Sequence, residues 1–230
     1  MRVMPERILL GWSGGKDSCT TLVQLLNDDR HEVAALVTTV TEGFDRISMH
    51  GVRRGLLEAQ AASLEVPLDI VYIPMDANHA AYQSRMEAAF TRYRQQGITT
   101  VAFGDLFLVD VRQYREEWLA RLGMQAIFPI WHQDTAQLAR AFIDQGFKAV
   151  ITCVDTTVLA PSFAGRRFDH QFLRDLPVTV DPCGENGEFH SFVFDGPIFQ
   201  RTVSFAKGRV VQRDSRSFCD LISTCPESRI

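Results

Sequence analysis

The stretch ILLGWSGGKDS, residues 8–18, decides the fold of this 230-residue chain. Its first five residues form a short apolar run, which is typical of a buried strand. Residues 17–27 then carry apolar or small side chains at helical spacing, so two glycines stand between a predicted strand and a predicted helix. Adjacent glycines let a backbone adopt unusual dihedral angles and approach a ligand closely. The stretch therefore predicts a strand–loop–helix unit that opens an α/β fold.

The chemistry of this loop favours a phosphate. The amides and the positive dipole end of the following helix attract an anion. Ser13 and Ser18 add hydroxyl donors, Lys16 adds a positive charge, and Asp17 can hold Mg²⁺ or cap the helix. The pattern is neither a Walker loop nor a dinucleotide fingerprint. A tight turn whose glycines serve packing alone is the alternative. The predicted phosphate cradle comprises Ser13, Gly14, Gly15, Lys16, Asp17 and Ser18.

Strands and helices alternate through the first 130 residues. The predicted strands are 8–12, 32–40, 68–73, 98–103 and 125–128, and the predicted helices are 17–27, 52–64, 77–96 and 109–122. Apolar runs without alternation are typical of strands buried on both faces. The pattern predicts a domain at 1–130 with a doubly wound, Rossmann-like, five-stranded parallel sheet. Its ligand is expected at the carboxyl ends of the strands.

The second part of the chain has a different pattern, which predicts a smaller α+β domain at 131–230. A helix at 135–145 and a strand at 149–154 precede three predicted hairpin strands at 189–194, 198–205 and 209–212. Asp-Gly-Pro and Lys-Gly sequences mark the turns between those strands. The tail from residue 215 onward has little pattern and is expected to be poorly ordered.

The composition excludes several classes of protein. The net charge of −4 gives no general basic signature for nucleic acid, and no apolar run is long enough to span a membrane. The start of the chain lacks the apolar core of a signal peptide, so a cytoplasmic location is expected. Five scattered cysteines without a C-x-x-C pair predict free thiols. Only three lysines stand against 21 arginines, and one of the three is Lys16.

A second polar motif, PCGENGEFH, occupies residues 182–190. Glu188 and His190 are two residues apart and would share one face of a strand, while Glu185 lies in the preceding loop. Two carboxylates and an imidazole can orient an amine, bind Mg²⁺ or transfer a proton near neutral pH. An ordinary polar entry into a hairpin is the alternative interpretation, since Gly and Asn also mark turns.

The SGGKDS loop resembles the signature of the PP-loop ATP pyrophosphatases, which have the adenine nucleotide alpha hydrolase-like fold. The resemblance implies that the loop binds the β- and γ-phosphates of ATP, which leave together as pyrophosphate. It also implies that the backbone of Val37, Thr38 and Thr39 contacts adenine. Members of this superfamily adenylate an oxygen of an acceptor, and a nitrogen or sulfur nucleophile then displaces AMP.

Further motifs resemble the diphthine–ammonia ligase subfamily, in a short form of bacterial type. They are the second motif with the SFVFDGP that follows it, Phe103-Gly104-Asp105, and Met49-His50-Gly51-Val52. The resemblance implies adenylation of an acceptor carboxylate, then attack by ammonia. The implied substrate residues are Gly184, Glu185, Asn186, Glu188 and His190, and the implied catalytic residues are Lys16, Asp17, Glu185, Glu188 and His190.

Weaker assignments follow from position in the chain. Gly104 and Asp105 end a predicted strand at the ligand edge, where Asp105 could bind ribose or Mg²⁺. His50 belongs to a polar segment, 41–50, which could cover the nucleotide. ATP, Mg²⁺, ammonia and an acceptor carboxylate are thus the expected cofactors and partners, and the number of subunits is open, with a homodimer among the alternatives.

Two other functions are compatible with the sequence. One is thiolation of a tRNA base, which usually requires paired reactive cysteines and a basic face. The other is a regulatory module that binds ATP or AMP without turnover. The complete SGGKDS loop favours the ATP-dependent, AMP-forming amide ligase over both.

Overall fold

The computed structural model describes residues 4–47 and 51–224, and these form two compact units that are discontinuous in sequence. The first unit contains the residues up to 13 together with 17–45 and 66–132. The second unit contains 14–16, 46–65 and the residues from 133 onward. A linear division near residue 130 therefore misses two segments of the amino-terminal half that pack with the second unit.

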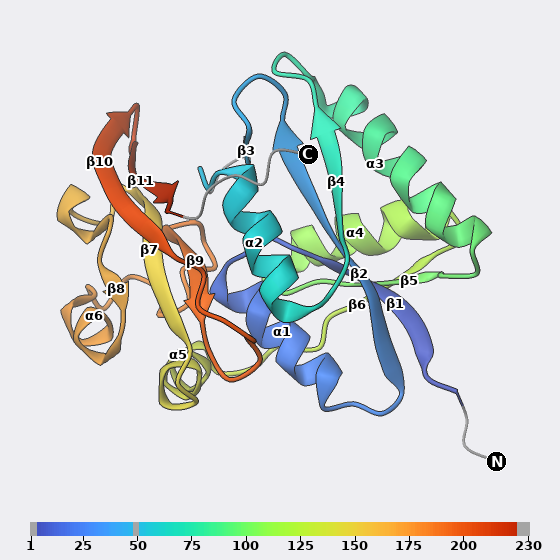
Figure 1. The fold of residues 1–230 in the computed structure, drawn as a ribbon, viewed down its shortest axis with the longest axis horizontal. Coiled ribbons are helices and arrows are strands. Elements are labelled where there is room, and N and C mark those ends of the chain that lie inside the picture. Colours follow the sequence, from blue (N-terminus) through green and yellow to red (C-terminus); the bar gives the residue numbers. More distant parts are fainter. Residues whose placement is uncertain (1–3, 48–50, 225–230) are drawn as a thin grey trace. The chain divides into compact units, whose positions relative to one another are not determined.

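Five parallel strands of the first unit pair in the order β4-β2-β1-β5-β6, and the two-residue strand β3 (Arg46–Ile47) is the sixth strand of the same sheet (Figure 1). The strands are β1 (Glu6–Gly11), β2 (His31–Thr41), β4 (Leu68–Ile73), β5 (Thr100–Ala102) and β6 (Gln125–Ile127). Connections between parallel strands need crossovers, here provided by helices. These elements confirm the α/β class and the five parallel strands that the sequence predicts, and β3 is an additional short strand.

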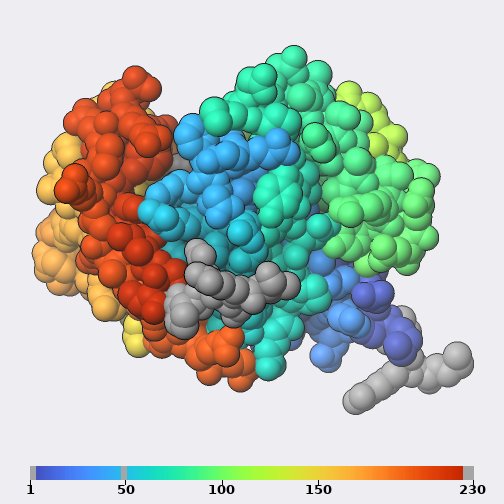
Figure 2. All heavy atoms as spheres, turned by 45° about the horizontal axis from the view of Figure 1, so that its top comes forward, coloured from blue at the N-terminus to red at the C-terminus, as the bar shows by residue number. Residues whose placement is uncertain are grey.

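Helices α3 (His79–Gln95) and α4 (Val109–Arg121) pack against one face of this sheet, and their side chains form the green and yellow-green surface in Figure 2. The core beneath them contains Leu9 and Val37 from the sheet and Phe90, Trp118 and Leu119 from the helices. Helix α1 (Lys16–Leu26) directly follows the glycine loop. The apolar runs of the strands thus meet the apolar stripes of the helices, as the two periodicities require.

The second unit has an antiparallel sheet in the order β10-β11-β7-β8, and β9 also pairs with β7 (Figure 1). The strands are β7 (Lys148–Asp155), β8 (Arg167–Phe168), β9 (Phe189–Asp195), β10 (Phe205–Arg213) and β11 (Arg216–Ser223). The helical elements of this unit are α2 (Arg54–Leu64), α5 (Thr135–Asp144), the short 3-10 helix η1 (Pro161–Phe163) and α6 (His170–Asp175). The two-residue strand β3 (Arg46–Ile47) also belongs to it.

Three sequence predictions in this unit are wrong, and one of them is the turn at Lys207-Gly208, which lies inside β10. The predicted strand at 198–205 is an irregular segment until Phe205, because the Gln200 amide bonds to the carbonyl of Ser63 on α2. The tail expected to be poorly ordered contains β11, which lies between β10 and β7. Its inward positions are Ser217, Cys219 and Leu221. Only one of these three is large and apolar, so the alternation is weak in the sequence.

Arg46 and Arg53 are attached to β11 by an ionic cluster. The Asp220 carboxylate accepts hydrogen bonds from Arg46 at 2.8 Å and from Arg53 at 2.8 and 3.2 Å. Gly51 has a φ of +68°, and a Cβ there would lie 3.1 Å from the ring of Phe218. This cluster anchors Arg53, which directly precedes α2.

Candidate functional site

The loop residues Gly14–Lys16 belong to the second unit, where they are bonded to β9. The Gly14 carbonyl oxygen accepts from the Val193 amide at 2.9 Å and from Gln60 Nε2 at 3.0 Å. The Lys16 amide donates to Ser191 Oγ at 3.2 Å. Gly14 has a φ of +74°, and a Cβ there would lie 2.7 Å from Leu57 Cδ2. Glycine is therefore required here both by backbone conformation and by space.

The ammonium of Lys16 is buried and points at the second motif. The residue is 3% exposed, and its Nζ donates to the carbonyl oxygen of Cys183. The rings of Phe168 and Phe189 have their centroids 5.9 and 5.6 Å from Nζ, within the range of a cation–π contact. A carbonyl dipole and two aromatic faces thus surround the charge. That Lys16 binds a phosphate stays a prediction.

The remaining loop residues lie in the first unit. The hydroxyls of Ser13 and Ser18 are 3.2 Å apart, and half-buried Asp17 lies in the first turn of α1. A Cβ on Gly104 would lie 3.0 Å from the Asp17 carbonyl and from Thr21 Oγ1. The segment after β5 thus runs directly beside the start of α1. This brings the predicted residues Asp17 and Gly104 together.

The predicted adenine segment is the carboxyl-terminal part of β2. The Val37 carbonyl oxygen accepts from the Trp12 amide at 2.8 Å, so it is already bonded within the sheet. Thr38 is 3% exposed, and its Oγ1 has no hydrogen-bond partner among the described residues. Thr39 is half-buried. A buried hydroxyl without a partner is unusual and marks Thr38 as a group that a ligand could satisfy.

Asp105 lies at the carboxyl edge of the sheet in an ion pair with Arg115. Arg115 Nε is 2.8 Å from Asp105 Oδ2 and its NH2 nitrogen is 3.2 Å from Oδ1. The guanidinium also stacks 4.2 Å from the centroid of the Phe103 ring. Because Arg115 contacts both carboxylate oxygens, a metal ion at Asp105 would compete with a guanidinium. Within residues 4–47 and 51–224, no group of three or more metal-ligating side chains occurs.

The second motif is a tight loop leading into β9. Asp181 Oδ2 accepts from the amides of Cys183 and Glu185 at 3.1 and 3.0 Å. Gly184 has a φ of +72°, and a Cβ there would lie 2.8 Å from the Phe189 carbonyl oxygen. The fold of this loop thus depends on Asp181, which the sequence analysis did not single out.

Glu188 is the most informative residue of the second motif. It is 6% exposed, and its Oε1 accepts from the Asp181 amide at 3.1 Å and from Asn186 Nδ2 at 2.9 Å. Its Oε2 is buried and has no hydrogen-bond partner among the described residues. Such an oxygen can accept from an ammonium or an amine. Half-buried His190 follows on β9, and its carbonyl oxygen accepts from Thr152 Oγ1 at 3.3 Å.

The structure thus gathers Gly14, Lys16, Cys183 and Ser191 in one unit, and Asp17, Gly104 and Asp105 with its partner Arg115 in the other. His50 lies outside the described residues. Gln60, Ser191, Arg115 and Asp181 were missed by sequence reasoning. Gln60, Arg115 and Asp181 lie outside the motifs, Ser191 is the first residue of SFVFDGP, and no spacing pattern identifies any of the four as functional.

Comparison with known proteins gives two family matches that together span most of the chain. Residues 6–126 match the diphthamide synthase N-terminal domain, and residues 134–224 match the diphthamide synthase C-terminal domain. The chain belongs to the diphthamide synthase family. The two matched segments contain the glycine loop and the second motif respectively.

Relatives of this diphthamide synthase family member are distant. Diphthine–ammonia ligases of Danio rerio and Homo sapiens are 25% and 23% identical, over 83% and 90% of this chain and 83% and 85% of their own lengths. The Schizosaccharomyces pombe diphthine–ammonia ligase is 23% identical over 94% of this chain, which spans 39% of that protein. The solved U34-tRNA thiolase NcsA of Methanococcus maripaludis covers 60% of this chain and 57% of its own at 21% identity. Its TM-score of 0.35 is too low to support a common function.

The described thiols of this family member are all buried. They belong to Cys19, Cys153, Cys183 and Cys219. Burial raises the pKa of the Cys19 thiol far above its usual range, and it raises the pKa of Cys153 to about 11. Because the thiolate is the reactive form, the thiols of Cys19 and Cys153 are poor nucleophiles at neutral pH. In the described ranges, no helix has the length and apolar character needed to cross a bilayer.

Proposed function

We propose that this protein is an ATP-dependent, AMP-forming amide ligase that joins ammonia to an acceptor carboxylate. The observation that carries the proposal is the glycine loop between β1 and α1, whose Lys16 side chain donates to Cys183 of the second motif. Membership of the diphthamide synthase family and relatives named diphthine–ammonia ligase support the same reaction class. Diphthine is therefore the first acceptor to test.

The proposed reaction has two steps. A carboxylate oxygen of the acceptor attacks the α-phosphorus of ATP, and pyrophosphate leaves. Ammonia then attacks the carbonyl carbon of the acyl-adenylate, the proton it loses passes to a nearby base, and AMP leaves. The amides of Gly14 and Gly15 and the hydroxyls of Ser13 and Ser18 would stabilise the departing pyrophosphate by preorganised electrostatics. No covalent enzyme intermediate is needed, since positioning supplies much of the rate.

Magnesium would neutralise charge on the triphosphate when bound. Mg²⁺ commonly uses one or two carboxylates together with the substrate phosphates, so a pre-formed cage of side chains is not required. Half-buried Asp17 has the right donor chemistry at the start of α1. Asp105 is the weaker candidate because Arg115 already contacts its carboxylate.

The second motif would receive ammonia. Glu188 Oε2 is a buried acceptor with no hydrogen-bond partner among the described residues, and it would hold the nitrogen as ammonium or as an amine. Glu185 and His190 would assist as acceptors of a proton or of the substrate. The buried thiols support amidation over sulfur transfer, since none of the four described cysteines is exposed.

Turnover with defined substrates tests the proposal. The protein is incubated with ATP, Mg²⁺, ammonium and candidate acids, diphthine on its carrier protein included, and the nucleotide products are separated. Acid-dependent release of AMP and pyrophosphate is expected. Release of ADP and phosphate, or tight ATP binding without turnover across the acids, would contradict it.

A further inference from the structure

Gln60 is buried in the second unit and holds the glycine loop onto β9. We propose that it is a positioning residue for the phosphate loop: it fixes the Gly14 carbonyl beside Val193 and thereby sets the direction of the loop amides. The inference rests on the proposed function, because it assumes that this loop binds the phosphates of ATP. It concerns a residue on α2 that lies outside both sequence motifs.

The contacts of the Gln60 amide define its role. Gln60 is fully buried, and its Nε2 lies 3.0 Å from the Gly14 carbonyl oxygen and 2.6 Å from the Val193 carbonyl oxygen. Both partners are acceptors only, so the NH₂ group must face them. The Val193 amide donates to the same Gly14 oxygen at 2.9 Å. One side chain thus bridges the loop and the strand, and both donor hydrogens of Nε2 are used.

A second contact repeats this arrangement two residues earlier on β9. Ser191 Oγ accepts from the Lys16 amide at 3.2 Å, and Ser191 and Val193 are both buried. The backbone amide of Val193 therefore holds Gly14 and the side chain of Ser191 holds the Lys16 amide, while the Cys183 carbonyl accepts from the Lys16 ammonium. Gly15 lies between these two attached residues.

The chemical consequence concerns preorganisation. A loop that stabilises a leaving pyrophosphate must present its amides before the charge develops. Gln60 has no donor hydrogen left for a phosphate, so it acts through Gly14. Without the Gln60 amide, the Gly14 carbonyl oxygen keeps the hydrogen bond from the Val193 amide and loses the one from Gln60 Nε2. The expected effect is weaker nucleotide binding by a protein that is still folded.

The test compares Gln60→Leu with Ser63→Ala, a matched control on the same helix. Ser63 is also buried, and its hydroxyl bonds to the backbone of Arg201 rather than to the loop. For Gln60→Leu we expect KM for ATP to rise about 10-fold with a smaller change in kcat. For Ser63→Ala we expect a similar shift in urea midpoint with KM within twofold of wild type. Equal KM values in the two variants would overturn the inference.

Hydrogen exchange separates this inference from the proposed function. In nucleotide-free protein, the amides of Lys16 and Val193 should exchange faster in Gln60→Leu than in wild type or Ser63→Ala. Ser191→Ala should accelerate the Lys16 amide, and Ser191→Thr should restore its protection. If wild type makes no AMP, the proposed function fails, but the exchange comparison still tests the role of Gln60. Unchanged protection of both amides in Gln60→Leu would contradict it.

Discussion

The Lys16 ammonium donates to the carbonyl oxygen of Cys183, although 167 residues separate the two along the chain. The first residue of α1 is thereby bonded to the loop that contains the second motif. A change in what surrounds the lysine therefore acts on Cys183, and Gly14–Lys16 are hydrogen-bonded to the second motif within the second unit.

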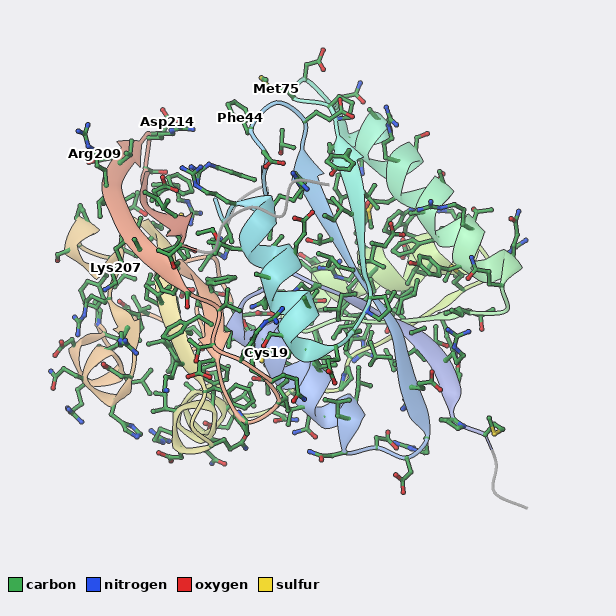
Figure 3. The ribbon with its side chains drawn as sticks, in the orientation of Figure 1. Cys19, Phe44, Met75, Lys207, Arg209 and Asp214 are labelled. Atoms are coloured by element: carbon green, nitrogen blue, oxygen red, sulfur yellow. The ribbon has the colours of Figure 1, made fainter. Side chains whose placement is uncertain are left out.

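Replacing Lys16 by methionine should abolish most turnover without unfolding the protein. Removing one preorganised electrostatic group from an active site typically lowers kcat by about 100-fold or more. Methionine has a similar length, and removing the cost of burying a charge offsets the hydrogen bond lost at Cys183. AMP release and urea unfolding are the measurements. Lys207→Met, at an exposed position on β10 (Figure 3), is the control and should keep wild-type activity. Wild-type turnover by Lys16→Met would remove Lys16 from the mechanism.

Substituting Gly14 by alanine should destabilise the second unit. The backbone has a φ of +74°, and the new Cβ would lie 2.7 Å from Leu57 Cδ2 and 2.9 Å from Gln60 Oε1. Conformational strain costs about 1 kcal/mol or more, and overpacking adds about 1–3 kcal/mol. The free energy of unfolding in urea measures the sum.

Gly146→Ala separates the two contributions to that sum. Gly146 has a φ of +89° with no atom within 4 Å of the new Cβ. Only conformational strain should therefore lower the free energy of unfolding in Gly146→Ala. An equal loss of stability at Gly14 and Gly146 would show that the contact with α2 is unimportant.

Glu188→Gln should raise the concentration of ammonium needed for amide formation. The substitution puts an amide nitrogen where Oε2 is, so an acceptor becomes a donor. We expect KM for ammonium to rise about 10-fold, equivalent to about 1.4 kcal/mol. The acid-dependent exchange of pyrophosphate into ATP, which needs no ammonia, should stay within twofold of wild type. Loss of that exchange would instead place Glu188 in the first step. Glu117→Gln, at an exposed site on α4, is the control.

Asp17→Asn should raise the Mg²⁺ concentration at half-maximal turnover about 10-fold, because a carboxylate ligand of a hard cation is replaced by a neutral amide. Asp105→Asn should change this value less, since Arg115 pairs with that carboxylate. Titrations of turnover with Mg²⁺ at saturating ATP measure both. A larger effect at Asp105 than at Asp17 would reverse the assignment.

The Asp220 cluster should make stability depend on pH in the acid range. Burial by itself raises the pKa of Asp220, but hydrogen bonds from Arg53 and Arg46 outweigh it and leave the pKa at about 2. In an unfolded chain the pKa of aspartate is about 3.9. The folded state thus gains stability above pH ~4 and loses it as pH falls from 4 toward 2.

Asp220→Asn should therefore lose about 1 kcal/mol at pH 7, the upper range for partly exposed ion pairs. Its free energy of unfolding should differ less from that of wild type at pH 3. Asp214→Asn, at the exposed turn between β10 and β11 (Figure 3), should show no such difference. If the difference in free energy of unfolding between Asp220→Asn and wild type is as large at pH 3 as at pH 7, the ion pairs of Asp220 do not cause that difference.

Local patterns in the sequence predict the elements of the first unit well, because its strands are short apolar runs and its helices have apolar stripes. They do not predict β11, where serine and cysteine occupy inward positions and leave only Leu221 as a large apolar signal. The motif residues are predictable because glycines, a lysine and carboxylates at fixed spacing are the residue types that bind phosphate, Mg²⁺ or an amine. Gln60 is not, because its partners Gly14 and Val193 are 46 and 133 residues away.

The central place of β11 also has a consequence for synthesis of the protein. The segments 14–16 and 46–65 emerge from the ribosome early, whereas their partners on β9 and β11 are translated more than 130 residues later. The second unit therefore cannot close its sheet until residue 223 has been released. Pairings over such separations fold slowly. During translation, Gln60 on α2 therefore lacks its partner Val193 until β9 has been made, and a chaperone that shields α2 would be most useful at this stage.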